Sequence, residues 1–275
     1  MREIGGTTAV ITGASRGIGV HIARALAAEG VNLSLAARSV AELDAVRDEM
    51  ATSGVRAIAT RCDVTDAADR AELLRRTESE IGPPDILINN AGIEIVNRFE
   101  SAAEDELTRI LDVNLTGAML LTRSVVPGML VRGRGHVVSI ASGAGKVGVP
   151  FEVAYAASKH GLVGMSNSLR CEYEAAPIGF SVVCPGFVSD TGMYARWEQD
   201  GFRAPKIAGR STPGKVARVV ISCIEKDRAE VVVNTPPVRP LIVLANIAPG
   251  IVPRLMRWFG YAGVFERMAK HGDHA

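Results

Sequence analysis

The chain lacks a long apolar run, lacks an excess of charge of either sign and has few cysteines. Its 275 residues carry 31 Lys and Arg against 30 Asp and Glu. No basic block of the kind that follows nucleic-acid phosphates occurs. The early apolar run is too short to cross a bilayer, and the first residues lack the regions of a signal peptide. We therefore expect a cytoplasmic protein that does not bind nucleic acid.

The four cysteines are scattered, at Cys62, Cys171, Cys184 and Cys223. No Cys-x-x-Cys pair and no cluster of histidines accompanies them. This pattern favours neither a disulfide framework nor a zinc site. We expect buried thiols in a reducing cytoplasm and no bound metal.

A glycine-rich stretch, Thr12 to Gly19, follows an apolar run and opens a helical pattern at Ile18. A strand that ends in a tight turn and leads into a helix presents free N–H groups and the positive end of the helix dipole. Glycine at 13, 17 and 19 lets the chain turn, lets a pyrophosphate approach and lets the helix pack on the sheet. A turn without a ligand is the alternative, but the flanking strand and helix are what a dinucleotide site requires.

Apolar runs alternate with helical segments along the chain. Strands are expected at 8–11, 31–37, 55–60, 85–88, 136–140, 179–183 and 230–233, and helices at 18–29, 40–52, 67–80, about 102–131, 153–174 and 213–226. This alternation predicts an α/β fold with a single-domain, doubly wound, Rossmann-like parallel sheet. Residues 1–235 are expected to form the dinucleotide-binding and catalytic domain, and 236–275 a C-terminal extension. Functional residues should lie beyond the carboxyl ends of the strands.

The cofactor choice depends on Arg38. A site that prefers NAD usually carries an acid about 20 residues after the glycines. Here the chain has Ala36-Ala37-Arg38-Ser39 instead. Arg38 could bind a 2′-phosphate through paired hydrogen bonds, and Arg16 could approach the same group. NADP(H) is therefore predicted; with NAD(H), the alternative, Arg38 would be a solvated residue at a helix start.

Tyr155 and Lys159 are four residues apart, so they share one face of the expected helix 153–174. A nearby ammonium lowers the pKa of a phenol, so Tyr155 could act as acid or base near neutral pH. Ser142 follows the strand 136–140 and could hydrogen-bond the reacting oxygen. A Tyr-x-x-x-Lys pair alone is common on surfaces and in cores, but the glycine loop upstream favours a functional pair.

These motifs resemble those of the short-chain dehydrogenase/reductase family, in its short, soluble form. The resemblance covers about residues 6 to 234 and rests on Thr12 to Gly19, 63–64, 89–92, Asn114, Ser142, Tyr155, Lys159 and 185–186. It implies that Tyr155 is the catalytic acid/base and that Lys159 lowers its pKa and holds the nicotinamide ribose. It also implies that Ser142 orients the substrate oxygen and that Asn114 supports a water-linked proton relay.

The resemblance extends the expected cofactor site beyond the glycine loop and Arg38. It implies that Asp63 bonds the adenine with the Val64 backbone beside it, and that the Val188 backbone contacts the nicotinamide amide. The family commonly has a threonine where this chain has Asp190, so the role of Thr191 stays open. The expected cofactor-binding residues are Gly13, Ser15, Arg16, Gly17, Ile18, Gly19, Arg38, Asp63, Val64, Asn90, Ala91, Gly92, Tyr155, Lys159, Pro185, Gly186 and Val188.

The segment of about 187–211 lacks a clear period and mixes Met193, Tyr194, Trp197 and Phe202 with Gly and Pro. A long loop at this edge of a sheet usually carries function, and aromatic residues suit an apolar ligand. The resemblance places it as the substrate loop. A hydrophobic carbonyl or secondary alcohol is therefore expected, although the aromatic residues could equally cap the core.

The tail has an apolar run from Leu241 that Asn246, Pro249 and Pro253 interrupt, so it is not expected to be a transmembrane helix. Its residues Arg254, Arg257, Trp258 and Phe259 could touch membrane lipids. An extension that closes the substrate cleft or packs on a partner subunit is the favoured interpretation.

We predict an NADP(H)-dependent oxidoreductase that moves a hydride to or from a carbonyl carbon. The family pairs the long helices that carry Asn114 and Tyr155, which implies a homodimer or homotetramer. An NAD(H)-dependent alcohol dehydrogenase of the same fold is the main alternative. Epimerases and dehydratases occur in longer relatives, and the short chain and Arg38 argue against them. The intact Ser142, Tyr155 and Lys159 argue against a non-catalytic cofactor sensor.

Overall fold

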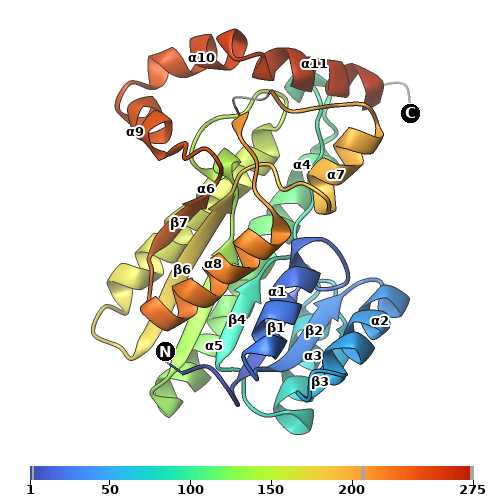
Figure 1. Ribbon diagram of the computed structural model, residues 1–275, viewed down its shortest axis with the longest axis vertical. Helices are drawn as coiled ribbons and strands as arrows, with labels where there is room; N and C mark the ends of the chain where they lie inside the picture. Colours follow the sequence, from blue (N-terminus) through green and yellow to red (C-terminus); the bar gives the residue numbers. More distant parts are fainter. Residues whose placement is uncertain (2, 206–207, 273–275) are drawn as a thin grey trace.

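The computed structural model describes residues 1, 3–205 and 208–272. Seven parallel strands form one sheet in the order β3-β2-β1-β4-β5-β6-β7 (Figure 1). This confirms the predicted Rossmann-like sheet. The strands are β1 (Thr8–Thr12), β2 (Asn32–Ala37), β3 (Ala57–Arg61), β4 (Ile86–Asn89), β5 (Gly135–Ile140), β6 (Ile178–Pro185) and β7 (Glu230–Val233).

Helices cover both faces of the sheet. One face packs against α1 (Ile18–Ala28), α2 (Val40–Ala51) and α8 (Pro213–Lys226). The other packs against α3 (Ala67–Glu80), α5 (Gly117–Arg132) and α6 (Val153–Glu172). Alternate side chains of a strand point to opposite faces, and both faces are buried, so the strands read as continuous apolar runs.

The chain builds β1, β2 and β3 outward, then returns to place β4 on the other side of β1. Within this arrangement Ile11 pairs in register with Ile88. Connections that leave in opposite directions open a crevice where β1 and β4 end. The glycine loop follows Thr12 at that point, which explains why a ligand would bind there.

Two segments differ from the sequence expectation. The single helix expected over about 102–131 is α4 (Glu104–Leu111), a π-helical turn at Asp112–Thr116, and α5. The segment without a clear period contains the helix α7 (Gly192–Gln199). The helix α7 has only about two turns, which is too short to show a helical period of apolar residues. The π-helical turn keeps the apolar pattern of the helices around it, so the sequence does not reveal it.

Cys171 also differs from the sequence expectation. It is exposed, whereas Cys62, Cys184 and Cys223 are buried as expected. Cys171 lies in the last turn of α6, next to the helix end at Glu172. The expectation of four buried thiols is therefore wrong at this one position.

After β7 the chain forms α9 (Arg239–Ile247), a short turn at Pro249–Ile251, α10 (Val252–Trp258) and α11 (Tyr261–Gly272). These helices lie across the upper end of the molecule in Figure 1, over α6 and α7. Within the described ranges no single helix has the length and apolar composition to cross a bilayer. The segments Arg239–Ile247 and Pro249–Trp258 together reach that length and apolar composition. The chain bends by 110° between them.

Candidate active site

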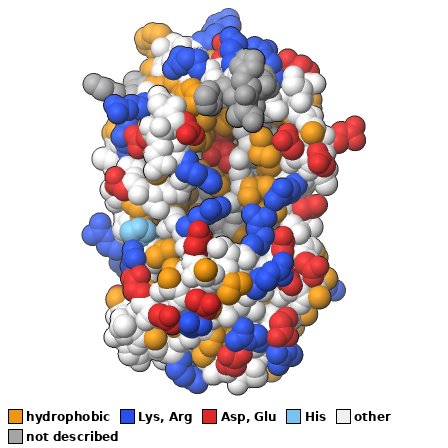
Figure 2. Space-filling model, turned by 90° about the vertical axis from the view of Figure 1, so that its right-hand side faces the viewer, with side chains coloured by type: hydrophobic (Ala, Val, Ile, Leu, Met, Phe, Trp, Pro, Cys, Tyr) orange, Lys and Arg blue, Asp and Glu red, His pale blue; other side chains and the backbone are white. Residues whose placement is uncertain are grey.

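A cavity of about 1070 Å³ opens beyond the carboxyl ends of the strands. Every site residue expected from the sequence lines it except Gly19 and Asn114, which lie behind its wall. In Figure 2 the hollow in the upper half of the face is bordered by Lys and Arg side chains. The structure therefore gathers residues from 13 to 188 around one space, as expected for groups at the ends of parallel strands.

The glycine loop lines the cavity where β1 leads into α1. Gly13 and Gly17 have φ of +65° and +66°, in the left-handed region that favours glycine. A Cβ on Gly19 would lie 2.3 Å from the carbonyl oxygen of Gly13, so a side chain cannot fit. The N-terminus of α1 has no side-chain cap and no acid in its first turn. Its free N–H groups therefore fit an anion such as a pyrophosphate.

Thr12 and Asn90 hold the glycine loop in place. The Thr12 Oγ1 accepts hydrogen bonds of 3.0 Å from the backbone N–H groups of both Asn90 and Ala91. In return, the Asn90 Nδ2 donates to the carbonyl oxygens of Thr12 at 2.9 Å and Gly13 at 3.0 Å. These bonds tie the end of β1 to the end of β4. Sequence reasoning assigned no role to Thr12, although a threonine beside a glycine turn tends to bond nearby backbone.

Arg38 and Arg16 stand exposed at the rim of the cavity. Within the described part of the chain neither forms an ion pair with a carboxylate. Ser39, the residue before α2, makes no capping hydrogen bond with its side chain. Arg38, Arg16 and Ser39 therefore leave donors free for an anion, and two acids, Glu42 on the first turn of α2 and Asp63, line the same cavity.

Asp63 lies beyond β3, where it faces the same cavity. Its carboxylate accepts hydrogen bonds from the N–H and the hydroxyl of Thr65, at 3.0 Å and 2.8 Å. Burial raises the pKa of Asp63, but these bonds and the charge of Arg38 together lower it further than burial raises it. Asp63 is therefore a stable anion near Arg38.

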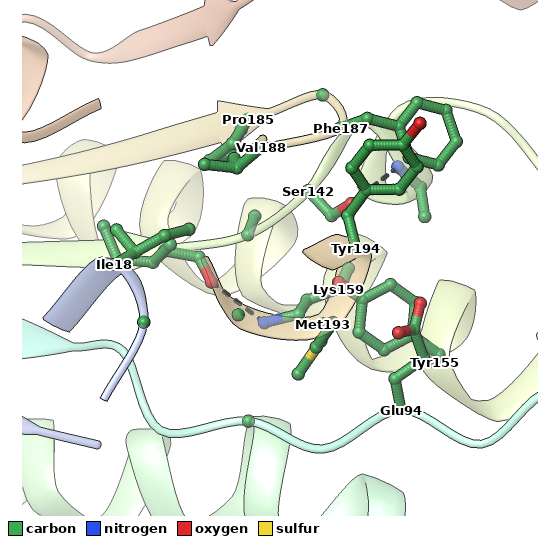
Figure 3. A pocket seen from close by; sticks show the side chains of 18 of the residues that line it. Ile18, Glu94, Ser142, Tyr155, Lys159, Pro185, Phe187, Val188, Met193 and Tyr194 are labelled. Atoms are coloured by element: carbon green, nitrogen blue, oxygen red, sulfur yellow. Dashed lines mark hydrogen bonds between the residues drawn. The ribbon is translucent and has the colours of Figure 1, made fainter. Parts of the chain in front are cut away.

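Ser142, Tyr155 and Lys159 line the cavity where β5 leads toward α6. The Lys159 Nζ donates to the carbonyl oxygen of Ile140 at 2.9 Å, drawn as a dashed line in Figure 3. The Ser142 hydroxyl accepts from the Ala144 N–H at 3.1 Å and is hydrogen-bonded to the Tyr155 phenol. Burial lowers the pKa of Lys159 to about 8.

The pKa of Tyr155 does not follow the sequence expectation. Burial raises it, the charges of Glu94 and Glu152 raise it further, and the hydrogen bond with Ser142 lowers it by less. The Lys159 ammonium lies 5.6 Å from the centre of the Tyr155 ring and is bonded to Ile140, so it does not face the phenol oxygen. The expected lowering of this pKa by Lys159 is therefore not found in this structure.

Glu94, which is half-buried, and Glu152, which is buried, form a pair of carboxyl groups beside Tyr155, and sequence reasoning missed both. Each side chain influences the pKa of the other, and Trp197 also lowers the pKa of Glu94. Burial raises the pKa of both, and for Glu152 the charge of Glu94 adds to it. Two neighbouring carboxylates that are shielded from water each make ionisation of the other less favourable. The sequence did offer one indication of these acids: Glu94 closely follows the motif 89–92, and Glu152 directly precedes the helix that carries Tyr155 and Lys159.

Asn114 lies on the π-helical turn and is fully buried. Its Oδ1 accepts from the Ile93 N–H at 2.8 Å, and its Nδ2 donates to the Ile93 carbonyl at 2.9 Å and to the Ser158 Oγ at 3.1 Å. A Cβ added to Gly92 would lie 3.4 Å from the Asn114 Oδ1 and 3.5 Å from the Lys159 Nζ. Asn114 thus fixes the segment after β4 against α6.

The residues at the end of β6 also line the cavity. The Gly186 N–H donates to the Val233 carbonyl at 3.0 Å, and a Cβ on Gly186 would lie 2.5 Å from the Asn234 Oδ1. Pro185 and the buried Val188 line the cavity here. Asp190, whose φ is +69°, and Thr191 line it too, and Thr191 precedes α7 without a capping bond from its side chain.

Aromatic and aliphatic side chains form the upper part of the cavity. The rings of Phe187 and Tyr194 are 5.0 Å apart, and Trp197 meets Phe265 of α11 edge-on at 5.3 Å. Met193 and Phe202 pack in the neighbouring apolar clusters. The tail completes this wall with Leu241, Ile242, Ala245, Val252, Leu255, Met256, Phe259 and Tyr261. Within the described residues no group of His, Cys, Asp or Glu is arranged to hold a metal ion.

The chain is similar to known proteins in both sequence and structure. The sequence model described as short chain dehydrogenase matches residues 7–201. The chain is 40% identical to the ketoacyl reductase HetN of Nostoc sp., over 98% of this chain and 95% of that protein. It is 34% identical to dehydrogenase/reductase SDR family member 7B of Bos taurus, over 90% of this chain and 79% of that protein.

Two solved structures have the same fold. Actinorhodin polyketide ketoreductase with NADPH superposes with a TM-score of 0.77 and 32% identity, over 83% of this chain and 95% of that one. A short-chain dehydrogenase/reductase from Burkholderia phymatum in complex with NAD superposes with a TM-score of 0.82 and 26% identity, over 91% and 96%. Both nicotinamide cofactors therefore occur among proteins that share this sheet.

Proposed function

The chain belongs to the short-chain dehydrogenase/reductase family, and from that premise we propose that it is an NADP(H)-dependent enzyme acting on a hydrophobic ketone or secondary alcohol. One observation carries this proposal. Ser142, Tyr155 and Lys159 line the same cavity as the glycine loop. A shared cavity suits a dinucleotide whose phosphates would bind at the loop while its reactive ring lies near Tyr155.

The residues present fit such a cofactor. The glycine loop, with Ser15 and Ile18, would hold the pyrophosphate at the N-terminus of α1. The free cations Arg38 and Arg16 would bind the 2′-phosphate, and Asp63 and Val64 would border the adenine. When bound, NADPH supplies the hydride for reduction.

Tyr155 would supply the proton. Because its pKa is raised, its phenol is protonated at neutral pH, which is the form that donates to a carbonyl oxygen. Ser142 would orient that oxygen through its hydroxyl, and Lys159 would bind the ribose. Asn114 would hold Ile93 and the base of α6 in position for a proton relay from Tyr155.

The substrate is proposed from the wall that faces Tyr155. The aromatic side chains and the tail give this end of the cavity an apolar lining. The relative in Nostoc is named a ketoacyl reductase. A ketone on an apolar chain, such as a ketoacyl group, fits both observations.

The assembly and the compartment are also proposals. Leu111, Met119 and Leu120 of α4 and α5 expose apolar side chains, and so does Val153 of α6. These helices would pair across a dimer or tetramer axis, which light scattering would measure against the 29.1 kDa chain. The four cysteines are free thiols, which supports a reducing compartment such as the cytoplasm.

Arg38→Asp tests the cofactor proposal. The substitution removes the proposed partner of the 2′-phosphate and puts a like charge beside it. The ratio of NADPH to NADH affinity should fall by about 10–100-fold, as for the loss of a charged hydrogen bond. Fluorescence titration with each cofactor at one fixed salt concentration measures it.

Arg218→Asp, on the exposed surface of α8, is the matched control and should leave the ratio unchanged. Tight NADH binding by the unaltered chain, with no response to Arg38→Asp, would contradict the NADP(H) proposal. Oxidation of alcohols with NAD would then be the function to test, since a relative in this fold was solved with that cofactor.

Replacing both acids, as Glu94→Gln/Glu152→Gln, tests their effect on Tyr155. Carbonyl reduction needs the protonated phenol, so the rate falls as pH rises through the pKa of Tyr155. Both carboxylates raise that pKa, so removing their charge should move the alkaline fall in kcat/KM to lower pH by about one unit. A pH profile with any accepted ketone measures the shift.

Glu104→Gln/Glu106→Gln removes the same charge from the first turn of α4, outside the cavity. Its pH profile should match that of the unaltered enzyme. An alkaline fall that stays in place or moves to higher pH in the Glu94/Glu152 variant would show that this pair does not act on Tyr155.

A further inference from the structure

The tail helices α9 and α10 have two different faces. Ile242 and Ala245 of α9 point inward and line the cavity, as do Leu255, Met256 and Phe259 around α10. On α9 the residues of the opposite face, Val243, Leu244 and Ile247, are exposed. The tail is therefore apolar on both sides, although only one side meets the rest of the protein.

The outer face is unusually apolar for a surface. Trp258 is 79% exposed and Ile247 is 77% exposed. Thirteen large hydrophobic side chains are exposed in the described residues, and four of them, Val243, Leu244, Ile247 and Trp258, lie in this short segment outside the cavity lining. Scattered exposed apolar residues need no explanation, but a concentration in one short segment marks an interaction site.

The charge of the same segment has one sign. Residues 236–265 contain Arg239, Arg254 and Arg257 and no Asp or Glu, in a chain whose overall charge is balanced. All three arginines are exposed, and none forms an ion pair within the described ranges. Basic and hydrophobic side chains lie together at the upper end of Figure 2. This combination complements a surface that is apolar beneath a layer of negative charge.

We propose that α9 and α10 bind the surface of a membrane that contains anionic lipids. Trp258 and the outer side chains of α9 would enter the interface, and the three arginines would bind the headgroup phosphates. The 110° bend between the two helical segments favours a position along the surface. If the proposed function holds, the same helices would let an apolar substrate pass from the lipid into the cavity.

Vesicle sedimentation tests this without any turnover, so its outcome is independent of the proposed reaction. The full-length protein should sediment with vesicles of equal parts phosphatidylcholine and phosphatidylglycerol, and much less with phosphatidylcholine alone. Arg254→Gln/Arg257→Gln should lower partitioning to the anionic vesicles by roughly thirtyfold. Ile247→Ser/Trp258→Ser should lower partitioning further and remove the blue shift of tryptophan fluorescence on binding.

Matched controls change similar residues elsewhere. Phe99→Ser/Val131→Ser removes exposed apolar side chains, and Arg218→Gln/Lys226→Gln removes two charges from α8. Both should sediment like the unaltered protein, and unchanged thermal melts would show that all variants are folded. No sedimentation with anionic vesicles would overturn the proposal. So would a mass that falls by half in Ile247→Ser/Trp258→Ser, because this face would then bind a second copy of the chain.

Discussion

Tyr155→Phe should lower kcat by about 10²–10⁴-fold, the usual contribution of a positioned general acid. The substitution removes one hydroxyl from a buried side chain and keeps the ring that packs between Lys159 and the Glu94–Glu152 pair. Binding of NADPH should change little, because the variant keeps the glycine loop, Arg38 and Lys159, which supply most of the proposed cofactor contacts. Steady-state kinetics with an accepted ketone and a parallel NADPH titration separate the two effects.

Tyr173→Phe is the matched control, since it removes a phenol hydroxyl at the end of α6, away from the cavity. It should leave kcat and KM unchanged. Turnover by Tyr155→Phe at the rate of the unaltered enzyme would show that another group supplies the proton, and the proposed mechanism would fail. The pH profiles of the Glu94→Gln/Glu152→Gln variant would then need a different explanation.

Gly19→Ala should weaken NADPH binding by about 100-fold or more and destabilise the fold by about 1–3 kcal/mol, the usual cost of overpacking. The new Cβ would lie 2.3 Å from the Gly13 carbonyl oxygen and 3.1 Å from the Ala14 Cα, so the backbone of the glycine loop must move. The Asn90 Nδ2, which holds that loop, would lie 2.8 Å away. A fluorescence titration and a thermal melt measure the two effects.

Gly214→Ala is the control, because no atom lies within 4 Å of a Cβ at that position and its backbone is helical. It should be neutral or slightly stabilising, since alanine favours helix over glycine. If Gly19→Ala bound NADPH like the unaltered chain, the turn at β1 and α1 would not be the place where the pyrophosphate binds.

The glycine loop and the sheet can be predicted because their signals are local. Strands and helices show in the spacing of apolar residues, and the loop shows in glycines at fixed separations. The apolar spacing predicts α3 with its observed bounds, Ala67–Glu80, and α8 with Pro213–Lys226. Parallel topology brings the strand ends to one edge, so the sequence alone predicts Arg38, Ser142 and Tyr155 around one ligand.

The electrostatic surroundings of the site could not be predicted in the same way. Nothing in the spacing of Tyr155 and Lys159 shows that the ammonium turns to the Ile140 carbonyl. Glu94 and Glu152 are 58 residues apart in the chain. They meet only because the segment after β4 packs against the start of α6. The pKa of a side chain depends on its burial and on the charges and hydrogen bonds around it. All of these depend on contacts between segments that are distant in the chain.

By itself, then, the sequence determined the order of strands and helices, the glycine turn at β1 and the presence of Ser142, Tyr155 and Lys159. Only the tertiary structure decided that Glu94 and Glu152 meet beside Tyr155 and that the tail lines the cavity with one face and exposes the other. Local periodicity is a property of neighbouring residues, whereas the burial of a charge and the exposure of an apolar side chain depend on what the rest of the chain places around them.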